Sequence, residues 1–343
     1  MKSRDVQTAS VSVVGGGSWG TALANLLGTK GYAVDFWVFE PEVRDAIIRQ
    51  RENMLFLPGV TLSENLFPSN DLAAVVSDKD LVLIVVPSHV MREVSSQVAG
   101  IISPDSIVVS ASKGIENQTH LTMSGILMET LPQIPASHLA ALSGPSFARE
   151  VAMGVPTVVT AASRNKAVAG FVQQVFSTPS FRVYTNEDLV GVELGGSVKN
   201  VIAIAAGVID GLGLGLNTRA ALITRGLTEM RRLGVRMGAN PRTFTGTAGI
   251  GDLVLTCTGD MSRNHTVGKK IGQGMTLTEI LAEMRMVAEG VKTAKSVYNL
   301  SRKLGVEMPI CHEIYHILYE DVPPKEALRR LMTRDLREEL DDF

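Results

Sequence analysis

The chain has only two cysteines, Cys257 and Cys311, and they lie far apart in the sequence. Two cysteines cannot build the multiple-disulfide framework of a small secreted domain or a four-thiolate zinc site. Two reduced thiols are typical of a protein in a reducing compartment. We therefore expect a cytoplasmic protein without structural disulfides.

The chain also lacks an excess of either charge and any long apolar run. Its 33 basic and 35 acidic side chains nearly cancel, and no block of like charge suggests a nucleic-acid groove or a membrane-docking face. The longest apolar run, 201–209, is far shorter than the ~20 residues that span a bilayer. The start, MKSRDVQTAS, has no apolar core of a signal peptide. We predict no nucleic-acid partner and no membrane insertion; a small anion held by a few local basic groups remains open.

What is present is a globular composition over 343 residues, with 45% hydrophobic and 20% charged side chains. This length favours two domains over one core. The first half alternates short apolar runs, which we interpret as buried strands, with amphipathic stretches. The predicted strands are 11–14, 33–39, 81–86, 106–111, 138–143 and 156–162. Strands separated by helical segments, such as 21–30 with Gly31 just past its end, indicate a doubly wound parallel sheet.

The pattern changes near residue 190, and no convincing strand follows Glu193. Helical periodicity instead marks the segments 198–212, 219–234, 277–284, 293–305 and 325–340. The prediction is an α/β protein with an N-terminal Rossmann-type parallel-sheet domain, residues 1–190, and an all-α C-terminal domain, residues 191–343.

Gly15, Gly17 and Gly20 form a G-x-G-x-x-G motif directly after the first predicted strand. The motif opens a helix, and a second strand follows within the ~30 residues of a βαβ unit. In this setting the first glycine permits the tight turn, the second admits a diphosphate, and the third lets helix and strand pack closely. The helix N-terminus then offers free N–H groups to the anion. The unit therefore predicts a dinucleotide site.

Glu40 lies where the motif requires an acidic residue, about 20 positions on. A carboxylate there would bind ribose hydroxyls and repel a 2′-phosphate, and the nearest arginine is Arg44. This favours NAD over NADP. The alternative is that Glu40 only caps a helix that begins at Pro41.

Six longer motifs carry a resemblance that covers essentially the whole chain in order. They are GGGSWGTALA at 15–24, SASKGIE at 110–116, LSGPSFARE at 142–150, GGSVKNVIAIAAGVIDGLGLGLNTRAALITRGL at 195–227, GTAGIGDLVLTCTGDMSRNHTVG at 246–268 and VAEGVKTA at 287–294. Together they closely resemble the bacterial NAD(P)-dependent glycerol-3-phosphate dehydrogenases. The resemblance implies NADH- or NADPH-dependent reduction of dihydroxyacetone phosphate to sn-glycerol 3-phosphate for phospholipid synthesis, by a homodimer.

The resemblance also implies roles for particular residues. Lys199 matches the catalytic lysine. The substrate contacts that it implies are Lys113, Gly144, Ser146, Lys199, Asp252, Ser262, Arg263 and Asn264. The implied cofactor contacts are Gly15, Gly17, Ser18, Trp19, Gly20, Phe39, Lys113, Ala148, Arg263, Val287 and Glu289. One position departs from the family, which often places histidine or arginine where this chain has Phe39, and this departure argues against the use of NADPH.

The chemistry of a ketone reduction suits these residue types. A lysine can donate the proton when burial and nearby cations lower its pKa. Lys199 lies in an apolar, small-residue helical segment and must find a partner there, for which Asp252 is the candidate. Taken alone, Lys199 could instead be a solvent-facing helix lysine.

Arg263 and Asn264 fit an anion site, because arginine offers a planar fork to phosphate oxygens and the amide adds a donor. A lone Ser-Arg-Asn is otherwise most often a turn. Lys113 follows a strand at the carboxyl edge where open α/β sheets bind ligands, although a lysine in that place is often just a solvated loop charge. His265 is expected near the site simply because it follows Asn264.

One competing motif is H-E-x-x-H at 312–316, which on a helix can bind zinc in a metalloprotease, with Glu338 or Glu339 as a third ligand. That interpretation leaves the glycine loop unexplained, and the surrounding spacing is that of a packed helix, so we predict no metal site. Two more functions are compatible with a Rossmann unit and a lysine in the helical half. They are another lysine-dependent hydroxyacid dehydrogenase and a non-catalytic NADH-binding regulator.

Overall fold

The computed structural model describes residues 5–284, 286–336 and 338–339. The chain divides into two compact units, and each is described by itself. Unit 1 is Met1–Lys113 with Leu121–Val192, and unit 2 is Gly114–His120 with Glu193–Phe343. The domain boundary between residues 190 and 191 stays a prediction.

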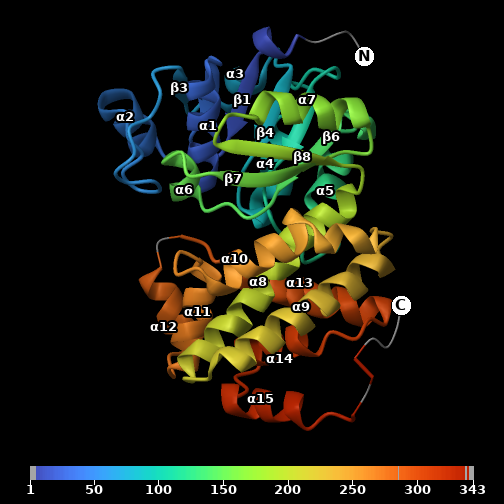
Figure 1. Ribbon diagram of the computed structural model, residues 1–343. Coiled ribbons are helices and arrows are strands. Elements are labelled where there is room, and N and C mark those ends of the chain that lie inside the picture. The colour runs from blue at the N-terminus through green and yellow to red at the C-terminus, as the bar shows by residue number, and fades with distance from the viewer. Residues whose placement is uncertain (1–4, 285, 337, 340–343) are drawn as a thin grey trace. The chain divides into compact units, whose positions relative to one another are not determined.

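Unit 1 contains one sheet of eight strands in the order β3-β2-β1-β4-β5-β6-β7-β8 (Figure 1). The strands are β1 (Val11–Val14), β2 (Val34–Trp37), β3 (Leu66–Ser69), β4 (Leu81–Ile84), β5 (Ile107–Ser110), β6 (Leu139–Ser143), β7 (Thr157–Ala162) and β8 (Phe181–Asn186). The order of the first six strands is that of a dinucleotide-binding Rossmann fold. The predicted fold class is confirmed.

The helices of unit 1 are α1 (Ser18–Lys30), α2 (Pro41–Gln50), α3 (Leu72–Val76), α4 (Met91–Gln97), α5 (Met123–Thr130), α6 (Ala148–Ala152) and α7 (Lys166–Phe176), with α8 (Leu189–Gly211) beginning in it. Short 3₁₀ turns lie at η1 (Val6–Thr8), η2 (Ser88–Val90) and η3 (Ala136–His138).

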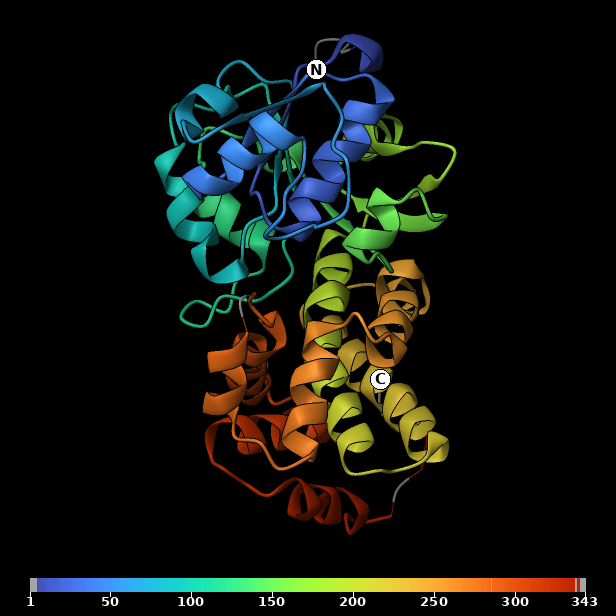
Figure 2. The ribbon, with the colours of Figure 1, turned by 90° about the vertical axis from the view of Figure 1, so that its left-hand side faces the viewer.

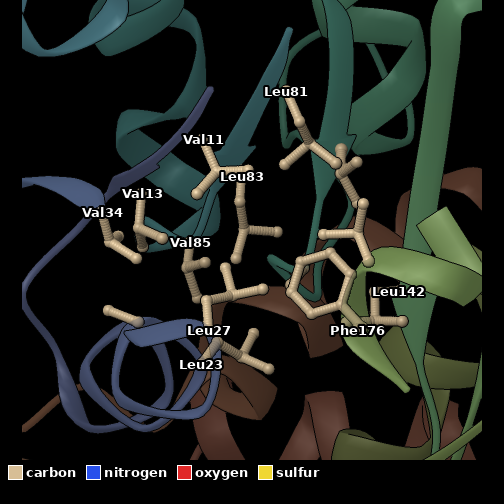
Figure 3. Close-up of a cluster of buried hydrophobic side chains, with 14 of the residues drawn as sticks. Val11, Val13, Leu23, Leu27, Val34, Leu81, Leu83, Val85, Leu142 and Phe176 are labelled. Carbon is tan, nitrogen blue, oxygen red and sulfur yellow. The ribbon is translucent and has the colours of Figure 1, made fainter. Parts of the chain in front are cut away.

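Alternate residues of the central strands enter two different apolar clusters, because successive side chains of a strand point to opposite faces. Leu81 and Leu83 of β4 pack with α1 and α7, whereas Val82 and Ile84 pack with α3, α4 and α5. Figure 3 shows the first cluster, in which Leu23 and Leu27 of α1 meet the sheet. Burial on both faces explains why these strands are continuously apolar in the sequence.

The sheet corrects the expectation of parallel strands throughout, because β7 runs antiparallel to β6 while β8 is parallel to β7. A parallel return needs a crossover long enough to span the strand. The connection from β6 to β7, residues 144–156, contains only the five-residue helix α6 and makes no such crossover. The chain therefore re-enters the sheet from the same edge.

Two strands of the sheet are absent from the sequence prediction. Strand β3 contains Pro68, which weakens a strand pattern and is tolerated here because β3 lies at one edge of the sheet. Strand β8 lies at the other edge and alternates buried Phe181 and Val183 with exposed Arg182 and Tyr184. That period of two is the signal by which β8 could be found.

Unit 2 has no strand among its described residues, as predicted. It holds most of α8, together with α9 (Leu216–Arg236), α10 (Asp252–Thr258), α11 (Arg263–Gly272), α12 (Leu277–Glu283), α13 (Glu289–Leu304), α14 (Pro309–Tyr319) and α15 (Pro324–Met332). A 3₁₀ turn, η4 (Pro241–Thr245), and one π-helical turn, η5 (Thr247–Gly251), precede α10. In Figure 2 these helices run from yellow-green to red. The last predicted helix, 325–340, ends earlier than expected, at Met332.

Helix α8 has the length and the apolar composition of a membrane-spanning helix, which the short run 201–209 does not suggest. Its most apolar window is entirely buried within the protein. A helix that is apolar on all sides is typical of a protein core as well as of a membrane, and here the burial accounts for its composition.

Candidate active site

The glycine loop lies between β1 and α1, in the predicted βαβ unit. Gly15 has a φ of 124°, a conformation that favours glycine, and its N–H donates to the Trp37 carbonyl over 3.1 Å. A Cβ on Gly20 would lie 1.9 Å from the Gly15 carbonyl oxygen. A side chain at position 20 would therefore push α1 away from the turn, so Gly20 serves the fold of the loop.

Gly17 differs from its neighbours because a Cβ built on it would meet no atom within 4 Å. It is the N-cap of α1 and has extended backbone angles, so no strain requires glycine there. The open space lies at a helix N-terminus, where unsatisfied N–H groups and the helix dipole favour an anion. The loop therefore fits the diphosphate of a dinucleotide.

This contrast predicts the effect of Gly17→Asp. Aspartate is a good N-cap, so the free energy of unfolding should change by less than about 1 kcal/mol. Its carboxylate would occupy the open space and repel the diphosphate, and we expect the Kd for NADH to rise about 100-fold. Fluorescence titration with NADH and a thermal melt measure the two effects.

The matched control is Gly215→Asp. Gly215 is the N-cap of α9 and also has open space around its Cβ position. That variant should keep the wild-type Kd for NADH. Unchanged NADH affinity in Gly17→Asp would contradict the assignment of the loop.

A buried asparagine, which no sequence motif marks, holds the glycine loop in place. Asn53 donates from Nδ2 to the Gly16 carbonyl and to Thr21 Oγ1, both over 2.8 Å. Ser18 Oγ donates to the Phe56 carbonyl over 2.5 Å. These bonds tie the chain around residues 53–56 to the loop. The role of Asn53 depends on a contact distant in sequence, so local patterns do not reveal it.

Trp19 and Ala148 are both half-buried and pack against the core of unit 1. Trp19 is in the first turn of α1 and Ala148 begins α6. The Trp19 indole N–H is buried and finds no hydrogen-bond acceptor within the described residues. Their predicted cofactor contacts stay predictions.

Phe39 and Glu40 follow β2 at the carboxyl edge of the sheet. The Phe39 ring is 72% exposed and rests edge-on against Trp37, with ring centroids 6.0 Å apart. Glu40 is indeed the N-cap of α2, but its side chain accepts no capping hydrogen bond. The carboxylate has no hydrogen-bond partner in the part of the chain that the structure describes. Arg44 is bound to Asp45 over 2.5 Å.

Lys113, Gly144 and Ser146 come together in unit 1, after β5 and β6. Lys113 Nζ donates to the Gly144 carbonyl over 3.4 Å, and Ser146 Oγ donates to the same oxygen over 3.0 Å. Both loops leave the carboxyl ends of adjacent strands, where open α/β sheets bind ligands. The structure thus groups three of the predicted substrate residues.

Lys199 is buried in unit 2, 6% exposed, and its ammonium group contacts two residues of α10. Nζ donates to Asp252 Oδ1 and, over 2.7 Å, to Thr256 Oγ1. The Thr256 hydroxyl donates in turn to the Asp252 carbonyl over 2.6 Å. The predicted partner, Asp252, is present, and Lys199 is not a solvent-facing helix lysine.

Of Lys199, Asp252 and Thr256, only Thr256 is not among the residues predicted from the sequence. It lies four residues after Asp252, one turn along α10, so helical periodicity in GIGDLVLTCT would place both side chains on one face. The π-helical turn η5 directly precedes Asp252, and such turns are frequent at functional sites.

Arg263 and Asn264 begin α11, in the same unit. The Arg263 side chain is exposed and forms no hydrogen bond with any described residue. Desolvation by neighbouring protein atoms lowers its pKa, and the charge of Glu289 opposes this. The guanidinium stays charged and is available to an anion at this helix N-terminus.

The Asn264 amide, by contrast, ties helices together. Its Nδ2 donates to Asn200 Oδ1 over 3.0 Å, and its Oδ1 accepts the Gly290 N–H over 2.9 Å. Ser262 Oγ is also occupied, since it accepts the His265 N–H over 3.2 Å as the N-cap of α11. These bonds give both side chains a structural role beside their predicted substrate roles.

Val287 and Glu289 lie at the start of α13, which the Gly290 bond places against Asn264. Val287 is exposed and Glu289 is half-buried. Unit 2 therefore brings together Lys199 with Asp252, and Asn264 with the start of α13, whereas the glycine loop, Phe39, Lys113, Ser146 and Ala148 belong to unit 1.

Comparison with known proteins shows the family. The sequence profile for NAD-dependent glycerol-3-phosphate dehydrogenase N-terminus matches residues 10–169, and the profile for its C-terminus matches residues 188–329. A glycerol-3-phosphate dehydrogenase [NAD(P)+] from Syntrophobacter fumaroxidans is 58% identical over 96% of this chain and 97% of its own. The chain belongs to the NAD-dependent glycerol-3-phosphate dehydrogenase family.

Two further relatives extend the comparison. A glycerol-3-phosphate dehydrogenase [NAD(P)+] from Geobacter sp. strain M21 is 59% identical over 96% of this chain and 98% of its own. The crystal structure of glycerol-3-phosphate dehydrogenase from Coxiella burnetii is 40% identical, has a TM-score of 0.91, and covers 95% of this chain and 99% of its own. Membership of the family makes the chain an oxidoreductase that uses a nicotinamide cofactor.

For a glycerol-3-phosphate dehydrogenase, the H-E-x-x-H motif needs no catalytic explanation. His312 Nε2 pairs with Ser301 Oγ over 2.7 Å, and His316 Nδ1 pairs with Glu320 over 2.7 Å. Within the described residues, no three histidine, cysteine or acidic side chains gather as metal ligands. The helix is anchored by Glu229, which accepts the Ile310 and Cys311 N–H groups, and burial raises the pKa of that carboxyl to about 7.

Proposed function

We propose that this chain reduces dihydroxyacetone phosphate to sn-glycerol 3-phosphate, reversibly, and so supplies glycerophospholipid synthesis. In this proposal residues 1–190 form the dinucleotide-binding domain, and residues 191–343 form the helical domain that supplies the catalytic lysine and the phosphate anchor. The observation that carries the proposal is the buried Lys199–Asp252–Thr256 group in a chain that also has an open glycine loop. The homodimer implied by the resemblance and the cytoplasmic location expected from the two cysteines stay predictions.

In this proposal Lys199 is the general acid of the reduction. A bound nicotinamide would supply the hydride. Asp252 and Thr256 accept hydrogen bonds from Nζ and so fix the direction in which the ammonium can donate. In the reverse direction the same amine accepts the proton from the alcohol. General acid–base catalysis of this kind contributes about 10²–10⁴-fold to a rate.

Arg263 is the proposed phosphate anchor, because its guanidinium is free of hydrogen bonds within the described residues. Asn264, Ser262, Lys113, Gly144 and Ser146 are proposed as further substrate contacts. The cofactor contacts proposed are Gly15, Gly17, Ser18, Trp19, Gly20, Phe39, Lys113, Ala148, Arg263, Val287 and Glu289.

A substrate panel tests this function against its competitors. Reduced cofactor should be consumed with dihydroxyacetone phosphate and hardly at all with 2-ketoacids, as the cofactor absorbance band shows. Preference for a ketoacid would favour another lysine-dependent hydroxyacid dehydrogenase. Cofactor binding with no turnover of any substrate would favour a regulator.

For the cofactor we propose a preference for NADH over NADPH. The Glu40 carboxylate lies at the end of β2 without a capping bond, and the nearest arginine, Arg44, is paired with Asp45. A carboxylate within about 5 Å of a 2′-phosphate costs roughly 3 kcal/mol at an effective dielectric constant of 20.

We therefore expect Glu40→Gln to improve kcat/KM for NADPH about 10- to 100-fold and to change that for NADH by less than about threefold. Steady-state rates with each cofactor measure both effects. The control is Glu42→Gln, which removes an exposed carboxylate from the first turn of the same helix and should leave the preference unchanged. An unaltered preference in Glu40→Gln would remove Glu40 from cofactor selection.

A further inference from the structure

Helices α8 and α11 of unit 2 cross with their backbones in direct contact. A Cβ on Gly207 of α8 would lie 2.0 Å from the His265 carbonyl oxygen, and a Cβ on Gly268 of α11 would lie 1.9 Å from the Ile204 carbonyl oxygen. No side chain separates the two helices at these points. Their spacing is therefore fixed by the main chain, and a small shift of α11 meets hard-sphere resistance.

A polar group of one buried and two half-buried side chains, His265 with Asp210 and Arg219, closes the same crossing. Asp210, near the end of α8, pairs through Oδ2 with His265 Nε2 over 2.8 Å, and its Oδ1 accepts from Arg219 of α9 over 2.5 Å. Burial alone would raise the pKa of Asp210, but the hydrogen bonds from Arg219 and His265 lower it. The carboxylate is thus ionised, and His265 Nε2 carries the proton that it donates.

The crossing holds two functional groups at a set separation. Lys199 lies on α8, two turns before Gly207, and Arg263 and Asn264 form the first turn of α11 directly before His265. The Asn200–Asn264 bond, 3.0 Å, also joins the two helices, next to Lys199 on α8 and next to Arg263 on α11. Any rotation of the first turn of α11 would move Arg263 relative to Lys199.

We propose that Asp210, His265 and Arg219 form a positioning clamp that fixes the first turn of α11, and with it the phosphate anchor, relative to Lys199. This inference rests on the proposed function. None of the three acts on the substrate; they act through Arg263 and Asn264. His265 is 5% exposed and its Nε2 is paired with Asp210, which suits it to holding a helix turn.

The test compares His265→Ala with His265→Gln, using dihydroxyacetone phosphate and unphosphorylated dihydroxyacetone as substrates. A misplaced anchor should lower kcat/KM for the phosphorylated substrate about tenfold or more, since displacement of about 1 Å can cost 10²-fold. The kcat/KM for dihydroxyacetone should fall less than about twofold, and kcat for dihydroxyacetone phosphate should fall less than about threefold. His265→Gln retains an amide donor toward Asp210 and should recover most of the loss.

His312→Ala is the matched control. His312 is a half-buried histidine of unit 2 whose ring likewise pairs with one side chain, Ser301, but it lies on α14. Its loss should leave the ratio of the two kcat/KM values unchanged. If His265 had a purely structural role, its loss would reduce the folded fraction and lower kcat/KM for both substrates by the same factor. That result would overturn the clamp.

Binding of inorganic phosphate separates this inference from the proposed function. Calorimetry should show weaker phosphate binding in His265→Ala than in the wild type, with recovery in His265→Gln. If the wild type turns over no dihydroxyacetone phosphate yet phosphate binding depends on His265 in this way, the proposed function fails and the clamp stands. Phosphate affinity that is equal in all three proteins overturns the clamp.

Discussion

Lys199→Met is expected to lower kcat for dihydroxyacetone phosphate by about three orders of magnitude, within the range that general acid–base groups supply. The methionine keeps an unbranched apolar stem like that of the lysine but lacks the ammonium group and cannot donate a proton. Because the glycine loop belongs to unit 1, the Kd for NADH should stay within about twofold of the wild-type value. Stopped-flow or steady-state rates and a fluorescence titration give the two quantities.

This variant also leaves Asp252 buried, 1% exposed, without its cation. Removing one partner of a buried ion pair costs about 3–5 kcal/mol of stability, so a melt must accompany the kinetics. The double variant Lys199→Met/Asp252→Asn removes the unpaired charge and should regain stability without regaining activity. Wild-type kcat in a folded Lys199→Met protein would exclude Lys199 as the proton donor.

Arg263→Met is expected to reduce kcat/KM for dihydroxyacetone phosphate about 10- to 100-fold, because a hydrogen bond to a charged group contributes about 1.5–3 kcal/mol. With NADH saturating, so that the proposed cofactor contact of Arg263 does not limit the rate, unphosphorylated dihydroxyacetone has no phosphate for the guanidinium and should lose less than about threefold. The loss should appear in KM, since the anchor acts on bound substrate and on the transition state alike.

Stability should change little in Arg263→Met, because the Arg263 side chain is exposed and forms no hydrogen bond with a described residue. The matched control is Arg242→Met, an exposed arginine of η4 in the same unit, which should behave as the wild type. An equal decrease in kcat/KM for the phosphorylated and the unphosphorylated substrate would show that Arg263 does not bind the substrate phosphate.

Local sequence patterns predict much of the fold correctly. Strand β1, the glycine loop and the end of α1 at Gly31 follow from residue types at fixed short spacing. The reversal at β7 does not follow, because it depends on the pairing of β7 with β6 in three dimensions and not on residue types at short spacing. Strand β3 is hidden by Pro68, which only an edge position tolerates.

The candidate site divides in the same way. Long motifs indicate Lys199, Asp252 and Arg263, and the structure adds Thr256 through one turn of helix. Asn53 and the Asp210–His265 pair act across 32 to 55 positions of sequence, as their hydrogen bonds show. Neither residue type nor spacing reveals such contacts, so they become visible only when the helices and loops are packed.

The most direct test of the proposed function is one assay: NADH, dihydroxyacetone phosphate and the purified chain, with the product identified by its chirality. We expect loss of the reduced-cofactor absorbance in equal amount to newly formed sn-glycerol 3-phosphate, at a rate that falls about a thousandfold in Lys199→Met. Absence of turnover with both NADH and NADPH, in a protein that binds the cofactor, would contradict it.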